Sequence, residues 1–111
     1  MNIQQEKSDI LKMMRHHIPD KDSGWIWYNV VLPKLDLPEN LVPPSITSSF
    51  LAAIYHLFAD NVDGFTYSLE RGLYWEARPY LTKVMNFLVD KYGSSESKAV
   101  CQQWTANDGT N

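Results

Sequence analysis

The sequence predicts an all-α protein, a single compact domain of five or six helices, from three observations. Apolar residues recur at helical spacing in several segments, and Ser, Pro or Gly residues that favour helix ends flank these segments. The length of 111 residues suits one domain with one hydrophobic core. We expect a helical domain over residues 1–104 and a disordered C-terminal tail over residues 105–111, which is polar and contains glycine.

The first element is predicted to be an amphipathic helix from Asn2 to Ile18. Its apolar residues fall on one face, which we expect to be buried: Ile3, Ile10, Leu11, Met14 and Ile18. Its charged residues are expected to point outward or to the edges of that face: Glu6, Lys7, Lys12 and Arg15. Pro19 then ends the helix, because proline cannot continue its hydrogen-bond ladder.

The second segment, from Trp25 to Leu35, fits neither helical nor strand periodicity cleanly. It is rich in residues common in strands, but strict alternation fails and the helical wheel is apolar nearly all round. Its length and a possible N-cap at Ser23 favour a helix, which Pro33 would shorten or kink. A helix with so little polar surface needs a cover, either from the core of this chain or from another protein.

The remaining segments include the two helices that we expect at the centre of the domain. Ser45 is a candidate N-cap for a third helix over Ile46–Asp60, which we expect to pack against a helix over Pro79–Tyr92. The latter is the most clearly marked helix, since its apolar residues cover roughly 200° of the helical wheel. Pro79 suits its first turn, and Gly93 suits its end. Shorter helices are expected over residues 65–72 and 95–104.

Composition and charge limit the possible functions. The net charge of −3 argues against binding to nucleic acid or to an anionic membrane surface. No apolar run approaches the roughly 18 residues that a membrane span requires. Cys101 is the single cysteine, so no internal disulfide is possible and a reducing cytoplasm is the expected location. On its apolar stripe, this thiol is expected to be buried and inert.

Catalytic and metal-binding motifs are absent from the sequence. The adjacent His16 and His17 would point about 100° apart on a helix, so we expect structural histidines rather than metal ligands. His56 and Asp60 are four residues apart, a spacing more often found in a surface contact than in a catalytic pair. No glycine-rich phosphate loop, metalloprotease motif or nucleophile elbow occurs. We therefore expect no enzyme activity, no cofactor and no metal.

Acidic and aromatic residues alternate over residues 60–76. No Lys or Arg occurs between Leu35 and Glu70, so this part of the chain carries negative charge. Carboxylates around exposed Tyr and Trp are typical of a protein-binding surface, although Trp75 could equally close the end of the helical bundle. We predict that seven residues bind a protein partner: Asp60, Asp63, Tyr67, Glu70, Tyr74, Trp75 and Glu76.

In its small size, acidity, single cysteine and the segment Asn61-Val62-Asp63-Gly64-Phe65, the chain resembles the small cytoplasmic immunity proteins of bacterial toxin systems, including contact-dependent growth inhibition. The resemblance implies an immunity protein that binds one cognate toxin, commonly a nuclease with a basic cleft, and blocks it stoichiometrically. It implies no particular functional residues. An immunity protein of this kind is expected to be a monomer or a weak dimer.

The alternative is a small helical adaptor or structural subunit of a larger bacterial or phage assembly. This hypothesis depends on the apolar segment Trp25–Leu35, which would assemble with another protein or with a second copy. The two hypotheses differ in the expected oligomeric state and in which surface is used.

Overall fold

A computed structural model of the chain describes residues 2–72 and 79–109. Over these residues it contains six α-helices and no strand, which confirms the predicted all-α fold. The α-helices are α1 Ile3–His17, α2 Ser23–Ile26, α3 Ser48–Phe58, α4 Val62–Gly72, α5 Pro79–Tyr92 and α6 Ser95–Gly109. Three short helical segments complete the fold: η1 Trp27–Val31, η2 Leu32–Lys34 and η3 Glu39–Leu41.

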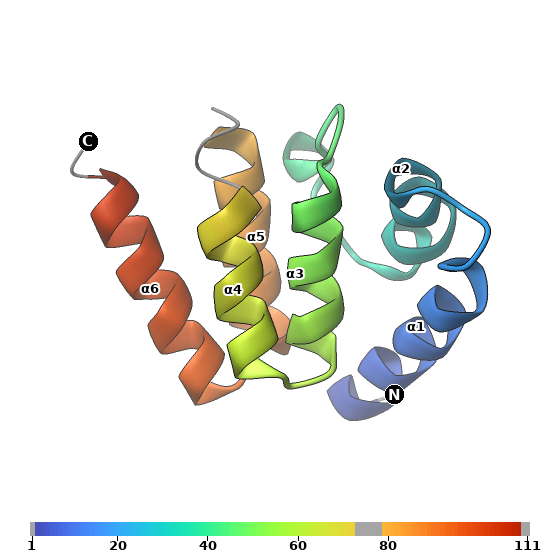
Figure 1. Ribbon diagram of the computed structural model, residues 1–111, viewed down its shortest axis with the longest axis horizontal. Helices are drawn as coiled ribbons and strands as arrows, with labels where there is room; N and C mark the ends of the chain where they lie inside the picture. The colour runs from blue at the N-terminus through green and yellow to red at the C-terminus, as the bar shows by residue number, and fades with distance from the viewer. Residues whose placement is uncertain (1, 73–78, 110–111) are drawn as a thin grey trace.

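Helix α3 lies at the centre of the molecule. It contacts α1, α2, α4 and α5, whereas α6 packs against α4 and α5 on the far side (Figure 1). The predicted contact between the third helix and the helix beginning at Pro79 is thus confirmed, although α3 rather than α5 has the most neighbouring helices. A helix surrounded in this way must be apolar on several sides, and six residues of α3 are buried.

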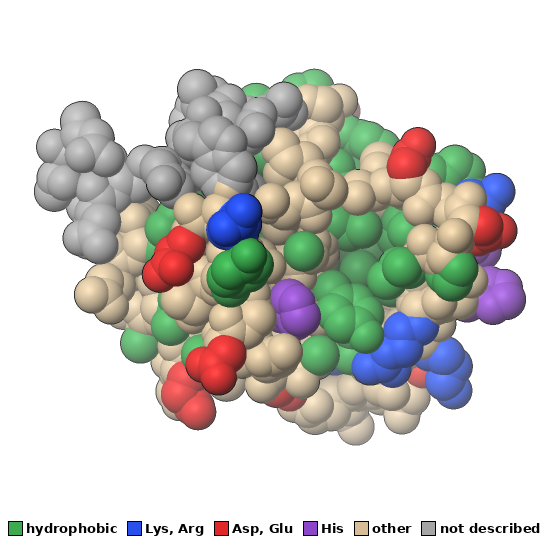
Figure 2. All heavy atoms as spheres, in the orientation of Figure 1, with side chains coloured by type: hydrophobic (Ala, Val, Ile, Leu, Met, Phe, Trp, Pro, Cys, Tyr) green, Lys and Arg blue, Asp and Glu red, His purple; other side chains and the backbone are tan. Residues whose placement is uncertain are grey.

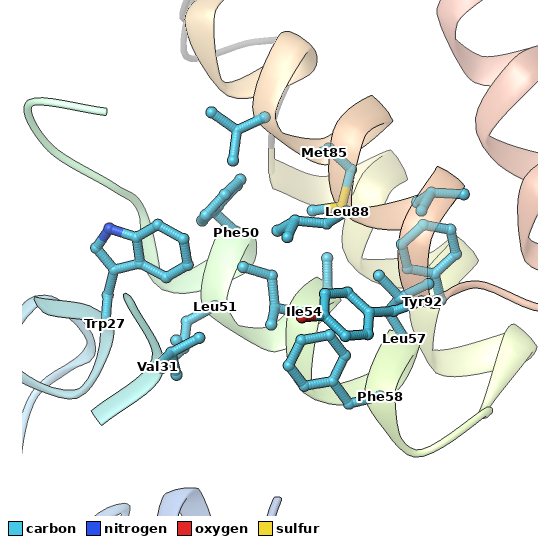
Figure 3. Close-up of a cluster of buried hydrophobic side chains, with 14 of the residues drawn as sticks. Trp27, Val31, Phe50, Leu51, Ile54, Leu57, Phe58, Met85, Leu88 and Tyr92 are labelled. Atoms are coloured by element: carbon cyan, nitrogen blue, oxygen red, sulfur yellow. The ribbon is translucent and has the colours of Figure 1, made fainter. Parts of the chain in front are cut away.

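The hydrophobic core extends along both sides of α3 (Figure 3). On the α2 side, the Trp27 and Phe50 rings meet edge-on with their centroids 5.3 Å apart. Towards α5, the Phe58 and Tyr92 rings also meet edge-on, with their centroids 5.0 Å apart. Edge-to-face pairs of this kind add to the free energy gained from burying the rings.

The second segment is helical, but its hydrogen bonding changes along its length. Asp22, not Ser23, caps α2 by accepting the amide of Trp25 at 2.8 Å. The chain then continues as the π-helix η1 and the 3₁₀-helix η2. Four of its residues are buried against the rest of the domain: Ile26, Trp27, Val30 and Val31. The core of the chain itself therefore covers most of this apolar segment.

Several helix ends differ from their predicted positions. Thr47 rather than Ser45 caps α3, with its Oγ1 accepting the amide of Phe50 at 3.0 Å. The Ser45 hydroxyl instead lies 3.2 Å from the Tyr80 hydroxyl. At the C-terminus, α6 continues past Trp104 to Gly109, into the segment predicted to be a tail. The bounds of α5 agree with the prediction.

Two predictions for the first helix are wrong. Lys7 is only 3% exposed, and its ammonium donates to Asp60 Oδ1 at 2.8 Å and to the Tyr92 carbonyl at 3.1 Å. A buried lysine is tolerated because a carboxylate and a helix C-terminal carbonyl together compensate its charge. Ile18, predicted to be buried, is 47% exposed, because α1 ends at His17 and the chain turns there.

Two further predictions concern the single cysteine and membrane-spanning helices. Cys101 is buried as predicted, and its Sγ donates to Asn86 Oδ1 at 3.1 Å. Burial raises the pKa of this thiol, so it stays protonated and unreactive at neutral pH. Among the residues that the structure describes, none of the helices has the length and apolar character needed to cross a membrane.

Candidate protein-binding surface

The direction of α4 is set by its first turn and its buried face. Asn61 caps the helix, with its Oδ1 accepting the amide of Gly64 at 3.1 Å and its carbonyl accepting the amide of Phe65 at 3.0 Å. Phe65 and Leu69 are buried against the core. Because these two side chains point inward, the opposite side of α4 faces solvent.

Three of the predicted partner-binding residues share that exposed side of α4. Asp63, Tyr67 and Glu70 are spaced by four and three residues, so they lie on one helix face, and all three are exposed. We call these three residues the α4 surface. Tyr67 is 59% exposed, more than any other large hydrophobic residue among those described. In Figure 2, acidic and basic side chains flank a hydrophobic one over α4.

The Tyr67 ring is held by a neighbouring cation. The Arg71 guanidinium carbon lies 5.1 Å from the ring centroid, a cation–π distance one helical turn along α4. This contact restricts the ring without covering it. An aromatic side chain that is already restricted loses less conformational entropy on binding than a free one.

Asp60, the fourth predicted residue, has a different role in the structure. It precedes α4 in the left-handed region, with φ at 56°, where aspartate is tolerated better than most residues. Its carboxylate pairs with Lys7, and its side chain is 46% exposed. Asp60 is thus tied to the fold and cannot meet a partner as an unpaired carboxylate. The other three predicted residues, Tyr74, Trp75 and Glu76, lie outside the described residues.

A close contact between α3 and α4 positions the α4 surface. A Cβ at Gly64 would lie 2.5 Å from His56 Nδ1, so only glycine permits the helices to approach with the ring in place. The same His56 nitrogen lies 3.2 Å from Asn61 Nδ2. The His56 ring is half-buried beneath the first turn of α4.

Gly64→Ala is expected to lower the free energy of unfolding by about 1 kcal/mol, because the new methyl group forces the His56 ring out of its position. In a His56→Ala background the clash is absent. There the same substitution should stabilise the protein by up to about 1 kcal/mol, since alanine is a better helix former than glycine. Urea unfolding of the four proteins measures this coupling, and equal effects in both backgrounds would contradict the contact.

A hollow between α4 and α6 adjoins the α4 surface and was missed by the sequence analysis. It has a volume of about 220 Å³ and shares Glu70 with the α4 surface. Its lining comes from both helices: Thr66, Leu69, Glu70, Val100, Gln103 and Trp104. The apolar stripe of Val100 and Trp104 was the available signal, but the sequence does not show which helix this stripe faces.

In the described part of the chain, no group of three or more His, Cys, Asp or Glu residues could hold a metal ion. Comparison of the chain with protein-family models, with curated proteins and with solved structures finds no match in any of the three.

Proposed function

We propose that this protein is an immunity protein, which binds a cognate toxin through the α4 surface and keeps substrate out of the toxin's cleft. The observation that carries the proposal is the exposed Tyr67 between Asp63 and Glu70 on one face of a rigidly packed helix. A large aromatic ring among carboxylates suits a basic protein partner, because the ring supplies contact area and the acids supply attraction.

The geometry of α4 favours a binding role over a purely structural one. Tyr67 contributes nothing to the core, whereas its neighbours Phe65 and Leu69 already fill the inner side of the helix. The hollow beside Glu70 would accept a side chain from the partner next to the aromatic contact. Such a combination of an exposed anchor and an adjacent depression is common at the centres of protein interfaces.

Charge reversal on the α4 surface is expected to act mainly on association. Asp63→Lys combined with Glu70→Lys should slow association with a basic toxin about tenfold at low ionic strength and flatten its salt dependence. Tyr67→Ala should instead raise the dissociation rate by about tenfold or more, since it removes buried contact area. The partner is first recovered from the native host with tagged protein at low salt, and rates are then measured by surface plasmon resonance.

Asp90→Lys is the matched control, because Asp90 is an exposed acid on α5, away from the α4 surface. It changes the net charge by the same amount per site and should leave both rates within about twofold. Asp60 is left unchanged in these variants, because reversing its charge would disrupt the pair with Lys7. Unaltered kinetics in the charge-reversed and Tyr67→Ala proteins would contradict the proposed surface.

The adaptor hypothesis has less support in the geometry. Its segment, Trp25–Leu35, is covered largely by the chain itself, and its two exposed aromatic residues have partners within the molecule. The Trp25 ring lies 4.9 Å from the Lys21 ammonium, and the Tyr28 hydroxyl donates to the Pro43 carbonyl at 2.8 Å. Sedimentation separates the hypotheses, because an adaptor of this type would self-associate.

A further inference from the structure

A second feature of the surface lies between α3 and the first two helices, and its lining includes His56, which also contacts α4. The end of α1, the start of α2 and one side of α3 enclose a groove of about 460 Å³. We call it the α1–α3 groove. Its apolar lining is Met14, Ile18, Ile26, Leu51, Ala52 and Tyr55. Figure 2 shows hydrophobic side chains gathered in this region, with Lys and Arg side chains along its α1 side.

Half of the apolar lining of the groove is reachable from solvent, and the other half is buried: Met14, Ile26 and Leu51. Ile18 is 47% exposed at its edge, although its position in the sequence predicts burial. Ala52 and Tyr55 are partly exposed on the side of α3 that faces the groove. An apolar strip therefore stays open between three helices, and apolar side chains at helical spacing are the complement that such a groove binds.

The charges around the groove are unbalanced. Lys21 lines it, and Arg15 reaches its edge, where the guanidinium Nε donates to the Tyr55 hydroxyl at 2.9 Å. Asp22 is the one carboxylate in the lining, and it is already engaged as the cap of α2. The edge of the groove therefore presents two cations whose charges no lining carboxylate is free to balance.

We propose that the α1–α3 groove binds an amphipathic helix of a partner protein, with apolar side chains along one face and carboxylates along the edge of that face. The apolar side chains would lie against Ile18 and Tyr55, and the carboxylates would meet Arg15 and Lys21. This site differs in charge from the α4 surface, so it selects a different class of partner. The inference does not depend on the proposed inhibitor function.

Two helical probe peptides of about 16 residues test the charge requirement. Both carry the same leucine stripe at helical spacing, and the residues flanking the stripe are glutamate in one peptide and lysine in the other. Binding to the full chain is followed by fluorescence anisotropy. The glutamate peptide is expected to bind at least about tenfold more tightly than the lysine peptide, because of Arg15 and Lys21.

Three variants locate the binding. Ile18→Asp should weaken binding of the glutamate peptide at least about tenfold, and because the site is 47% exposed the variant is expected to stay folded, which circular dichroism checks. Lys21→Glu should remove most of the preference for the glutamate peptide. Asp90→Lys on α5 is the matched control and should leave the affinity for that peptide within about twofold.

Three results would overturn the proposal. The first is the absence of saturable binding by the glutamate peptide, and the second is equal binding of the two peptides. The third is a dimer, seen by sedimentation, that Ile18→Asp dissociates and that excludes the peptides, since the occupant would then be a second copy of the chain. Binding by the glutamate peptide that Ile18→Asp weakens, with the predicted charge preference, supports the proposal.

Discussion

Trp27→Ala is expected to lower the free energy of unfolding by about 3–5 kcal/mol, the range for removing a large buried aromatic side chain. The Trp27 side chain is fully buried and packs edge-on against Phe50 of the central helix α3. Removing it leaves a cavity between η1 and α3, which the rigid helices on either side cannot close. Urea unfolding followed by circular dichroism measures the change.

Trp27→Phe separates ring packing from the indole N–H. The Trp27 Nε1 is buried and has no hydrogen-bond partner among the described residues. Phenylalanine keeps a ring against Phe50 and removes this unpaired donor, so the cost should stay within about 1 kcal/mol. Trp25→Ala is the exposed control, because the Trp25 side chain is 37% exposed. If Trp27→Ala costs no more than Trp25→Ala, the assigned core is wrong.

Asp60→Asn is expected to destabilise the protein by about 1–3 kcal/mol, because it leaves the buried Lys7 ammonium without its counter-charge. Asparagine tolerates the left-handed conformation at this position, so the substitution tests the charge and not the backbone. The partial exposure of Asp60 reduces the strength of the pair through solvent screening, which places the estimate below that for a fully buried pair.

Lys7→Met provides the matched test of the ion pair. It removes the buried charge and keeps an unbranched side chain of similar length, while the half-exposed Asp60 remains solvated. Its cost should therefore be smaller than that of Asp60→Asn. In the double variant, Asp60→Asn should add little beyond the effect of Lys7→Met alone. Fully additive losses of unfolding free energy would show that the two side chains do not interact.

The sequence predicts the helical fold well, because helix formation depends mainly on local patterns. The bounds of α5 and the burial of Phe65 and Leu69 follow from apolar spacing of 3.6 residues and from residues that favour helix ends. The exposed face shared by Asp63 and Glu70 follows from the same period. These features need only neighbours within a few residues of the chain.

Helix caps are less well predicted, since several residues of the right type compete for each position. Ser45 and Thr47 are both suitable caps by residue type, and the structure selects Thr47. Ser45 lies beside Tyr80, a residue 35 positions away, so its hydroxyl is engaged by another helix. The choice between the two depends on the position of α5 in the fold, and this position cannot be predicted from the residues near Ser45 and Thr47.

The roles of Lys7, Asp60 and Ile18 were decided by the tertiary structure alone. Lys7 and Asp60 are 53 residues apart in sequence, and Lys7 and Tyr92 are 85 apart, so their contacts exist only after α1, α3 and α5 have packed. That packing buries Lys7, which was expected to lie on the surface. It also pairs the Asp60 carboxylate with Lys7, so Asp60 is no longer an unpaired acid. It also leaves Ile18 at the edge of an open groove, because α1 ends at His17 and the chain turns before Ile18 can join the buried face of that helix.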